Sequence, residues 1–110
     1  SKVIIDEKLR KEIGYEGVVM TDDMQMSSIW KYAQYCNTAK EALLAGNDIL
    51  LYSQYTPRAT LLTDVYNCIL NAITSGEIAE DVIDQKVLRI LKLKLKYGLI
   101  DEAILPLQAQ

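Results

Sequence analysis

Two short apolar runs stand about thirty residues apart in this chain of 110 residues, at 17–20 (GVVM) and 48–52 (DILLY). Each run has the length of a buried strand, and one amphipathic pattern at 27–45 lies between them. Two parallel strands need a crossover of a dozen or more residues, usually a helix, whereas antiparallel strands need only a turn. The spacing therefore predicts strands at 17–20 and 48–52 in a parallel βαβ unit, which is typical of α/β proteins.

Helical patterns fill most of the remaining chain. We expect helices at four segments, each directly followed by a glycine: 1–13, 27–45, 58–75 and 80–97. Glycine is common just past a helix C-terminus because it adopts the left-handed conformation without strain. The last of these segments also begins with acids and ends with lysines, which complements the helix dipole. The predicted order is helix, strand, helix, strand, helix, helix.

Two strands are few for so many amphipathic helices. A parallel sheet is normally covered on both faces, and an isolated pair of strands is marginal in water. The sequence is therefore expected to be the last part of a larger α/β fold. The alternatives are a noncatalytic α/β fragment that self-associates, because open sheet edges invite pairing, and an unrelated binding module.

The composition excludes several functional classes. Half of the residues are apolar, a quarter are charged, and the formal net charge is -3, which is typical of a chain that forms a core. A mildly acidic chain has no electrostatic footprint for nucleic acid. The purely apolar runs are far too short to span a bilayer, so no membrane partner is expected. A cytoplasmic location is favoured.

The cysteines and the missing histidines limit the chemistry. Cys36 and Cys68 are interpreted as buried free thiols in a reducing compartment rather than as a disulfide, because disulfide scaffolds normally carry more cysteines. The chain contains no histidine, which excludes Ser-His and Cys-His catalytic pairs within it. No metal-ligand spacing is present, so neither a metal nor a cofactor is expected.

Adjacent carboxylates follow the first predicted strand. Asp22 and Asp23 stand at its carboxyl end, where parallel α/β folds bind ligands. Asn47 and Asp48 stand at the opposite end of the second strand, where polar residues usually serve stability. Neighbouring residues of an extended segment point to opposite sides, so the two aspartates cannot act in the same way. The alternative is that Thr21 or an aspartate only caps the next helix.

The residues beside the aspartates are ambiguous. Met24 and Met26 are typical of core filler or a pocket wall, and Met26 is our candidate for a substrate contact. Trp30, the single tryptophan, suits packing against the sheet more than stacking on a sugar ring.

Three segments in the same order resemble glycoside hydrolase family 3, especially its β-N-acetylhexosaminidase branch. LRKEIGYEGVVMTDDMQM is similar to the family's seventh-strand segment, which ends in Ser/Thr-Asp-Asp-Leu-x-Met. EALLAGNDILLY is similar to its eighth strand, with Ala-Gly-x-Asp-x-Leu-Leu. ITSGEIAEDVIDQKVLRILKLKLKYGL is similar to its closing helices. The resemblance covers nearly the whole chain.

This resemblance implies a fold and an activity. The fold would be a TIM (β/α)₈ barrel, of which residues 1–110 form one partial domain with strands 7 and 8 and their flanking helices. The family hydrolyses terminal β-linked sugars with retention of configuration, here a β-linked N-acetylhexosaminide as carbohydrate substrate. Its nucleophile is the first aspartate of the motif, which is Asp22 in this sequence. Asp23 would be a supporting residue.

Departures from the family pattern limit what the chain can do alone. The upstream Lys-His-x-Pro-Gly motif and the His/Asp acid/base loop of the hexosaminidase branch are not in this sequence. Met24 stands where leucine is common, and Ala79 replaces a frequent capping serine. The chain is thus expected to hold a nucleophile without its acid/base partner and to be inactive by itself.

Overall fold

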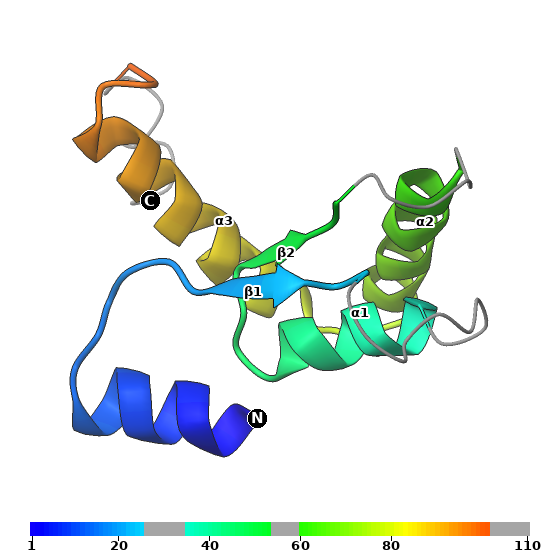
Figure 1. Ribbon diagram of the computed structural model, residues 1–110, viewed down its shortest axis with the longest axis horizontal. Helices are drawn as coiled ribbons and strands as arrows, with labels where there is room; N and C mark the ends of the chain where they lie inside the picture. The colour runs from blue at the N-terminus through cyan, green and yellow to red at the C-terminus, as the bar shows by residue number, and fades with distance from the viewer. Residues whose placement is uncertain (26–34, 54–59, 102–110) are drawn as a thin grey trace.

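The computed structural model describes residues 1–25, 35–53 and 60–101. Its elements follow in the order π-helix η1 (Val3–Glu12), strand β1 (Met20–Asp23), helix α1 (Tyr35–Leu44), strand β2 (Ile49–Leu51), helix α2 (Leu61–Thr74) and helix α3 (Glu80–Lys96) (Figure 1). Strands β1 and β2 pair in parallel across helix α1. The predicted order of elements and the βαβ unit are therefore confirmed. The first residues predicted for the second and third helices lie outside the described residues.

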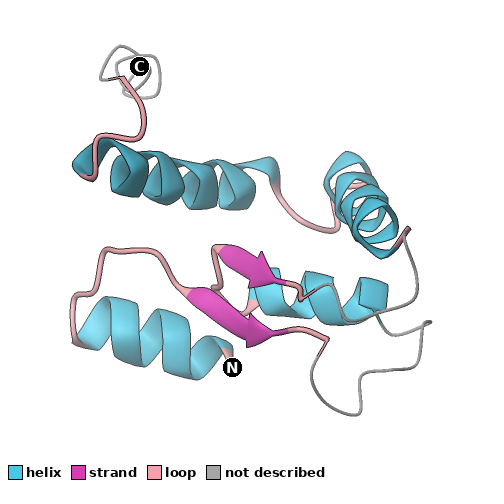
Figure 2. Ribbon diagram, turned by 45° about the horizontal axis from the view of Figure 1, so that its top comes forward, coloured by secondary structure: helices cyan, strands magenta, loops and turns pink. Residues whose placement is uncertain are grey.

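The first helix forms as predicted, but as a π-helix. The N–H of Ile13 donates to the carbonyl of Lys8, five residues back, at 3.0 Å. None of its residues is buried, and it lies on the other side of the strands from α3 (Figure 2). Gly46, with φ of 112°, permits its contact with α1, because a Cβ there would lie 2.6 Å from Asp6 Oδ1 and 2.7 Å from Ile5 Cγ2. A side chain at this position would strain the backbone and displace η1.

The strand predicted at 17–20 begins only at Met20 and includes both aspartates, so that prediction was wrong by three residues. The carbonyl of Val19 already accepts from the backbone N–H groups of Asp48 and Ile49, but the two carbonyls before it bond to side chains instead of to a neighbouring strand. Arg10 Nη1 donates to the carbonyl of Gly17 at 2.9 Å. Tyr15 Oη donates to the carbonyl of Val18 at 2.8 Å. The aspartates therefore lie inside the end of the strand rather than after it.

The apolar core lies between α1, α2, β2 and the start of α3. Its buried side chains form two clusters, which Leu50 and Ile69 join: Tyr35, Ala39, Leu61 and Val65 in one, Leu43, Ala72 and Ile78 in the other. Met20 on β1 and Leu51 on β2 stay 55% and 42% exposed. The strands therefore carry apolar side chains that the described residues leave uncovered.

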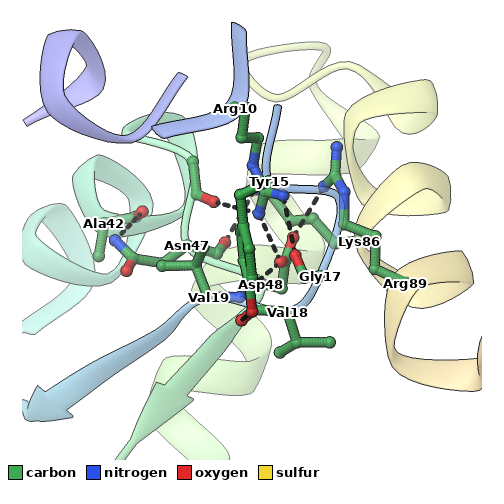
Figure 3. Close-up of polar contacts among 11 residues, drawn as sticks. Arg10, Tyr15, Gly17, Val18, Val19, Ala42, Asn47, Asp48, Lys86 and Arg89 are labelled. Atoms are coloured by element: carbon green, nitrogen blue, oxygen red, sulfur yellow. Dashed lines mark hydrogen bonds and ion pairs between the residues drawn. The ribbon is translucent and has the colours of Figure 1, made fainter. Parts of the chain in front are cut away.

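A buried carboxylate links the elements at the amino end of the sheet (Figure 3). The Asp48 side chain is fully buried; its Oδ2 accepts from Arg10 Nη2 at 2.7 Å and from the N–H of Val19 at 2.9 Å. Its Oδ1 accepts from Arg89 Nη1 at 2.8 Å. Asp48 thus joins η1, the segment leading into β1, and α3. This agrees with the prediction that polar residues at this end serve stability.

Lys86 of α3 adds a third cation, itself buried, to the region that Arg10 and Arg89 occupy. Its Nζ donates to the carbonyl oxygen of Asn47 at 2.8 Å, and only 5% of the residue is exposed. Burial lowers the pKa of Lys86, against the opposing effect of the Asp48 charge. The cations of α3 therefore hold that helix against the loop before β2.

A disulfide joins α1 to α2. Cys36 and Cys68 are bonded, with their Cα atoms 5.7 Å apart, so the prediction of two free thiols was wrong. The two cysteines are 32 residues apart in sequence, and only the packing of α1 against α2 brings them together. Disulfides persist in oxidising compartments, so the cytoplasmic location stays a prediction that this bond does not support.

Replacing Asp48 with asparagine should destabilise the fold more than replacing a surface acid. Asp48→Asn leaves two guanidinium groups without their counter-charge in a buried setting, and we expect a loss of about 3–5 kcal/mol in the free energy of unfolding. The matched control is Glu77→Gln, which removes the exposed Lys40–Glu77 ion pair of 3.0 Å and should cost less than about 1 kcal/mol. Urea denaturation measures both. Equal losses would contradict the central role of Asp48.

Breaking the disulfide should also lower stability. The bond closes a loop of 32 residues in the unfolded chain, for which loop-closure entropy gives about 3–4 kcal/mol. We expect the double variant Cys36→Ala/Cys68→Ala to lose most of this free energy of unfolding. A reductant should lower the melting temperature of the unsubstituted chain and leave that of the variant unchanged. A melting temperature that does not respond to the reductant would count against the bond.

Candidate active site

The two adjacent aspartates occupy the carboxyl end of β1 and differ in their surroundings. Asp22 is exposed and Asp23 is half-buried, which continues the alternation of exposure along the strand. This alternation agrees with the prediction that the two side chains face opposite sides. The structure thus places one carboxylate toward solvent and the other toward the neighbouring backbone.

Asp23 ties the end of β1 to the chain beyond β2. Its Oδ1 accepts from the N–H of Gln25 at 2.9 Å and from the N–H of Ser53 at 3.0 Å. The Ser53 side chain, followed by the N–H groups of Gln25 and Ser53, lowers the pKa of Asp23. The bond to Gln25 shapes the turn that directly follows the strand. Asp23 is therefore an ionised, structural group.

Asp22 makes a local contact. Within the described part of the chain, its hydrogen bond is the one that Oδ1 accepts from the N–H of Asp23, at 2.7 Å. This bond orients the carboxylate and uses one of its oxygens. An exposed carboxylate held in this way remains available to attack an electrophilic carbon.

The strand pairing is irregular between Met20 and Asp23. Met20 stands opposite Ile49, and Asp23 stands opposite Leu51, so β1 has one residue more than β2 between these pairs. The N–H of Leu51 donates to Thr21 Oγ1 at 3.0 Å instead of to a backbone carbonyl. Such bulges bend a strand and redirect a side chain, and they occur often beside active sites.

The segment after β2 reaches the same edge of the sheet but offers no second acid. Tyr52 is half-buried and packs against the core cluster that contains Tyr35. Burial, and secondly the charge of Tyr35, raises the pKa of Tyr52 above its usual value. Its phenol is therefore neutral at neutral pH. Among the described residues of this segment, Tyr52 and Ser53 carry hydroxyls only.

The predictions for Met26 and Trp30 are not tested by the structure. Met26 and Trp30 lie outside the described residues, so a substrate contact by Met26 stays a prediction. Met24 is 8% exposed, which agrees with core filler. The sequence did not predict that the Thr21 hydroxyl would bond to Leu51 or that the N–H of Ser53 would bond to Asp23. Both bonds depend on the register of the two strands, which neither strand specifies alone.

The described residues show neither a metal-binding cluster nor a helix that could span a membrane. Residues 1–25, 35–53 and 60–101 contain no group of three or more cysteines and acids placed to hold a metal ion. In the same ranges, no helix combines the length and apolar character that crossing a membrane requires.

The sequence model of the glycosyl hydrolase family 3 N-terminal domain matches residues 1–93. The chain belongs to this family. The family domain is of the TIM-barrel type, in keeping with the parallel βαβ unit seen here. The alternation of parallel strands with helices is what a barrel segment of this kind requires, and the Asp22–Asp23 pair lies at a strand's carboxyl end, where such folds bind ligands.

Solved structures and curated proteins of the family are similar to this chain. A glycoside hydrolase family 3 beta-N-acetylglucosaminidase from Paenibacillus sp. str. FPU-7 is 36% identical, with a TM-score of 0.79 over 90% of this chain and 18% of that one. The probable beta-glucosidase I of Aspergillus flavus is 33% identical over 84% of this chain and 9% of its own length. The beta-N-acetylglucosaminidase/beta-glucosidase of Cellulomonas fimi is 26% identical over 96% of this chain and 18% of its own length.

The chain spans a small part of the relatives that it matches, between 9% and 18% of the three described above. The likeness therefore covers nearly all of this chain but only one segment of each relative.

The contacts of Asp23 predict an acid-sensitive contribution to stability. Because folding lowers its pKa, the contribution is fully present above the unfolded value near 3.8 and is lost as pH falls through the folded value. We expect Asp23→Asn to be less stable than the unsubstituted chain at pH 7. The difference between them should shrink below about pH 4. Urea denaturation at a series of pH values measures this, with Asp22→Asn as the neighbouring control. A difference that is independent of pH would contradict the assignment.

Proposed function

We propose that this chain supplies the nucleophilic carboxylate, Asp22, to a retaining glycoside hydrolase that releases terminal β-linked N-acetylhexosamine. The observation that carries the proposal is the division between the two aspartates: Asp23 is bound to backbone, whereas Asp22 is exposed at the carboxyl end of a parallel strand. A nucleophile must be accessible to a substrate and must be held in a fixed position. Asp22 is exposed, and the N–H of Asp23 orients its carboxylate.

In the proposed reaction, Asp22 acts as the nucleophile, a role that an exposed and oriented carboxylate can fill. One oxygen attacks the anomeric carbon, the bond from that carbon to the leaving oxygen breaks, and a covalent glycosyl-enzyme forms. A separate acid gives its proton to the leaving oxygen, and water then releases the sugar with its configuration retained. The N–H of Asp23, which donates to Asp22 Oδ1, holds the carboxylate during attack. Asp23 thus supports the reaction without touching the substrate.

The acid/base is proposed to come from residues outside this sequence. The 110 residues contain no histidine, and the described segment after β2 adds no carboxylate at this edge. The chain by itself is accordingly proposed to be inactive. The likeness to the beta-N-acetylglucosaminidase from Paenibacillus sp. str. FPU-7 supports an N-acetylhexosaminide as substrate. The beta-N-acetylglucosaminidase/beta-glucosidase of Cellulomonas fimi and the probable beta-glucosidase I of Aspergillus flavus make a β-glucoside the alternative substrate.

We assign β1 and β2 to strands 7 and 8 of a TIM barrel. Their uncovered apolar side chains, Met20 and Leu51, support more sheet and more helices around this pair. A second copy of the chain would cover the same side chains, which is how a noncatalytic self-associating fragment would be built. Covalent labelling separates the two proposals, because a noncatalytic fragment forms no glycosyl-enzyme at Asp22.

A fluorinated glycoside that traps the glycosyl-enzyme should label Asp22 in a complete hydrolase domain that contains this chain. We expect peptide mapping to find the sugar on Asp22, with no labelling in Asp22→Asn and with Asp22 still the labelled residue in Asp23→Asn. The 110-residue chain alone should not turn over an aryl β-N-acetylglucosaminide. Labelling of another residue would refute the role of Asp22, and turnover by the chain alone would refute the missing acid/base.

A further inference from the structure

We propose that Thr21 is a positioning residue, whose hydroxyl stabilises the bulge in β1. This bulge leaves the Asp22 side chain exposed and places Asp23 opposite Leu51 of β2. The consequence for catalysis rests on the proposed function of Asp22. The consequence for strand register does not depend on any activity.

The Thr21 side chain stands in for a missing backbone acceptor. In a regular parallel pair, the N–H of Leu51 would donate to a carbonyl oxygen of β1. Here it donates to Thr21 Oγ1 at 3.0 Å, while the carbonyl of Leu51 accepts from the N–H of Met24 at 2.8 Å. Both backbone groups of Leu51 are therefore bonded although β1 carries an extra residue. The hydroxyl thus removes the cost that a bulge usually carries.

The bulge decides which aspartate meets β2. With regular pairing from Met20 and Ile49 onward, Asp22 would stand opposite Leu51, whereas the observed partner is Asp23. A shift of one residue moves every following side chain to the other face of the sheet. The bond from Asp23 to the N–H of Ser53 would then be lost, because the Asp23 carboxylate reaches that group from the observed register. One residue of slip would therefore exchange the two aspartates.

Few side chains can hold this position. The acceptor must sit one bond beyond Cβ to reach the neighbouring strand from within β1, which serine and threonine provide. Thr21 is half-buried, so its hydroxyl competes with less water than a fully exposed group would. Valine has nearly the same shape and a strong preference for strands but has no acceptor. Thr21→Val therefore tests the hydroxyl, and Thr21→Ser is the matched control that keeps it.

The first measurement follows the register in this chain by NMR. In Thr21→Val we expect exchange of the Leu51 amide hydrogen to become about five- to tenfold faster, which corresponds to one lost hydrogen bond. We also expect the cross-strand NOE between Leu51 and Asp23 to be replaced by one between Leu51 and Asp22. Thr21→Ser should keep the NOE to Asp23 and exchange within about twofold of the unsubstituted chain. A Thr21→Val chain that keeps the NOE to Asp23 overturns the proposal, whatever its exchange rate.

The second measurement follows the rate at which a fluorinated glycoside labels Asp22 in a complete hydrolase domain. We expect about a tenfold or greater loss in Thr21→Val and recovery in Thr21→Ser to within about twofold. Should Asp22 stay unlabelled in the unsubstituted protein, the proposed function fails, while the NMR result still decides whether Thr21 sets the register. Should labelling be unchanged in Thr21→Val although the register moves, the link from Thr21 to catalysis is overturned.

Discussion

The buried carboxylate of Asp48 is the contact on which the arrangement of this chain depends. Two guanidinium groups, from Arg10 in η1 and Arg89 in α3, and the N–H of Val19 converge on its two oxygens. A buried charge is tolerable only when such partners surround it, so each partner is fixed by the others. Because Val19 leads directly into β1, the same contact anchors the strand that carries the aspartate pair. Stability at the amino end of the sheet and geometry at its carboxyl end are therefore connected through one strand.

The carboxyl end of β1 shows how adjacent, identical side chains acquire different roles. Asp23 is surrounded by N–H donors and stays ionised as part of the backbone scaffold, whereas Asp22 is exposed with one local bond. No difference in chemistry between the residues explains this; the difference lies in the direction that the strand gives each Cβ. The bulge between Met20 and Asp23 sets that direction. In the proposed hydrolase, the register between β1 and β2 therefore determines that Asp23 is structural and Asp22 is reactive.

The chain matches only a small segment of its relatives, and it exposes apolar side chains that a larger fold would cover. Met20 and Leu51 on the strands remain exposed, as do Leu62 and Tyr66 on α2. A sheet of two strands supplies too little area for the apolar faces of the helices around it. The matched relatives are five to ten times longer by the shares covered, and they belong to a barrel-type family. The disulfide between α1 and α2 contributes to holding together a segment whose own core is small.

The sequence alone determined the order of the elements, the parallel pairing and the family, because hydrophobic periodicity, helix-ending glycines and the Thr-Asp-Asp motif are local signals. It also indicated that Asp48 serves stability, from its place at the amino end of a strand. Where β1 begins, whether the two cysteines form a disulfide, and which aspartate meets β2 were decided only by tertiary structure. Each of these depends on a partner about thirty residues away or more: Asp48 for Val19, Cys68 for Cys36, Leu51 for Thr21. Such contacts arise when helices and strands pack, and no local pattern in the chain encodes them.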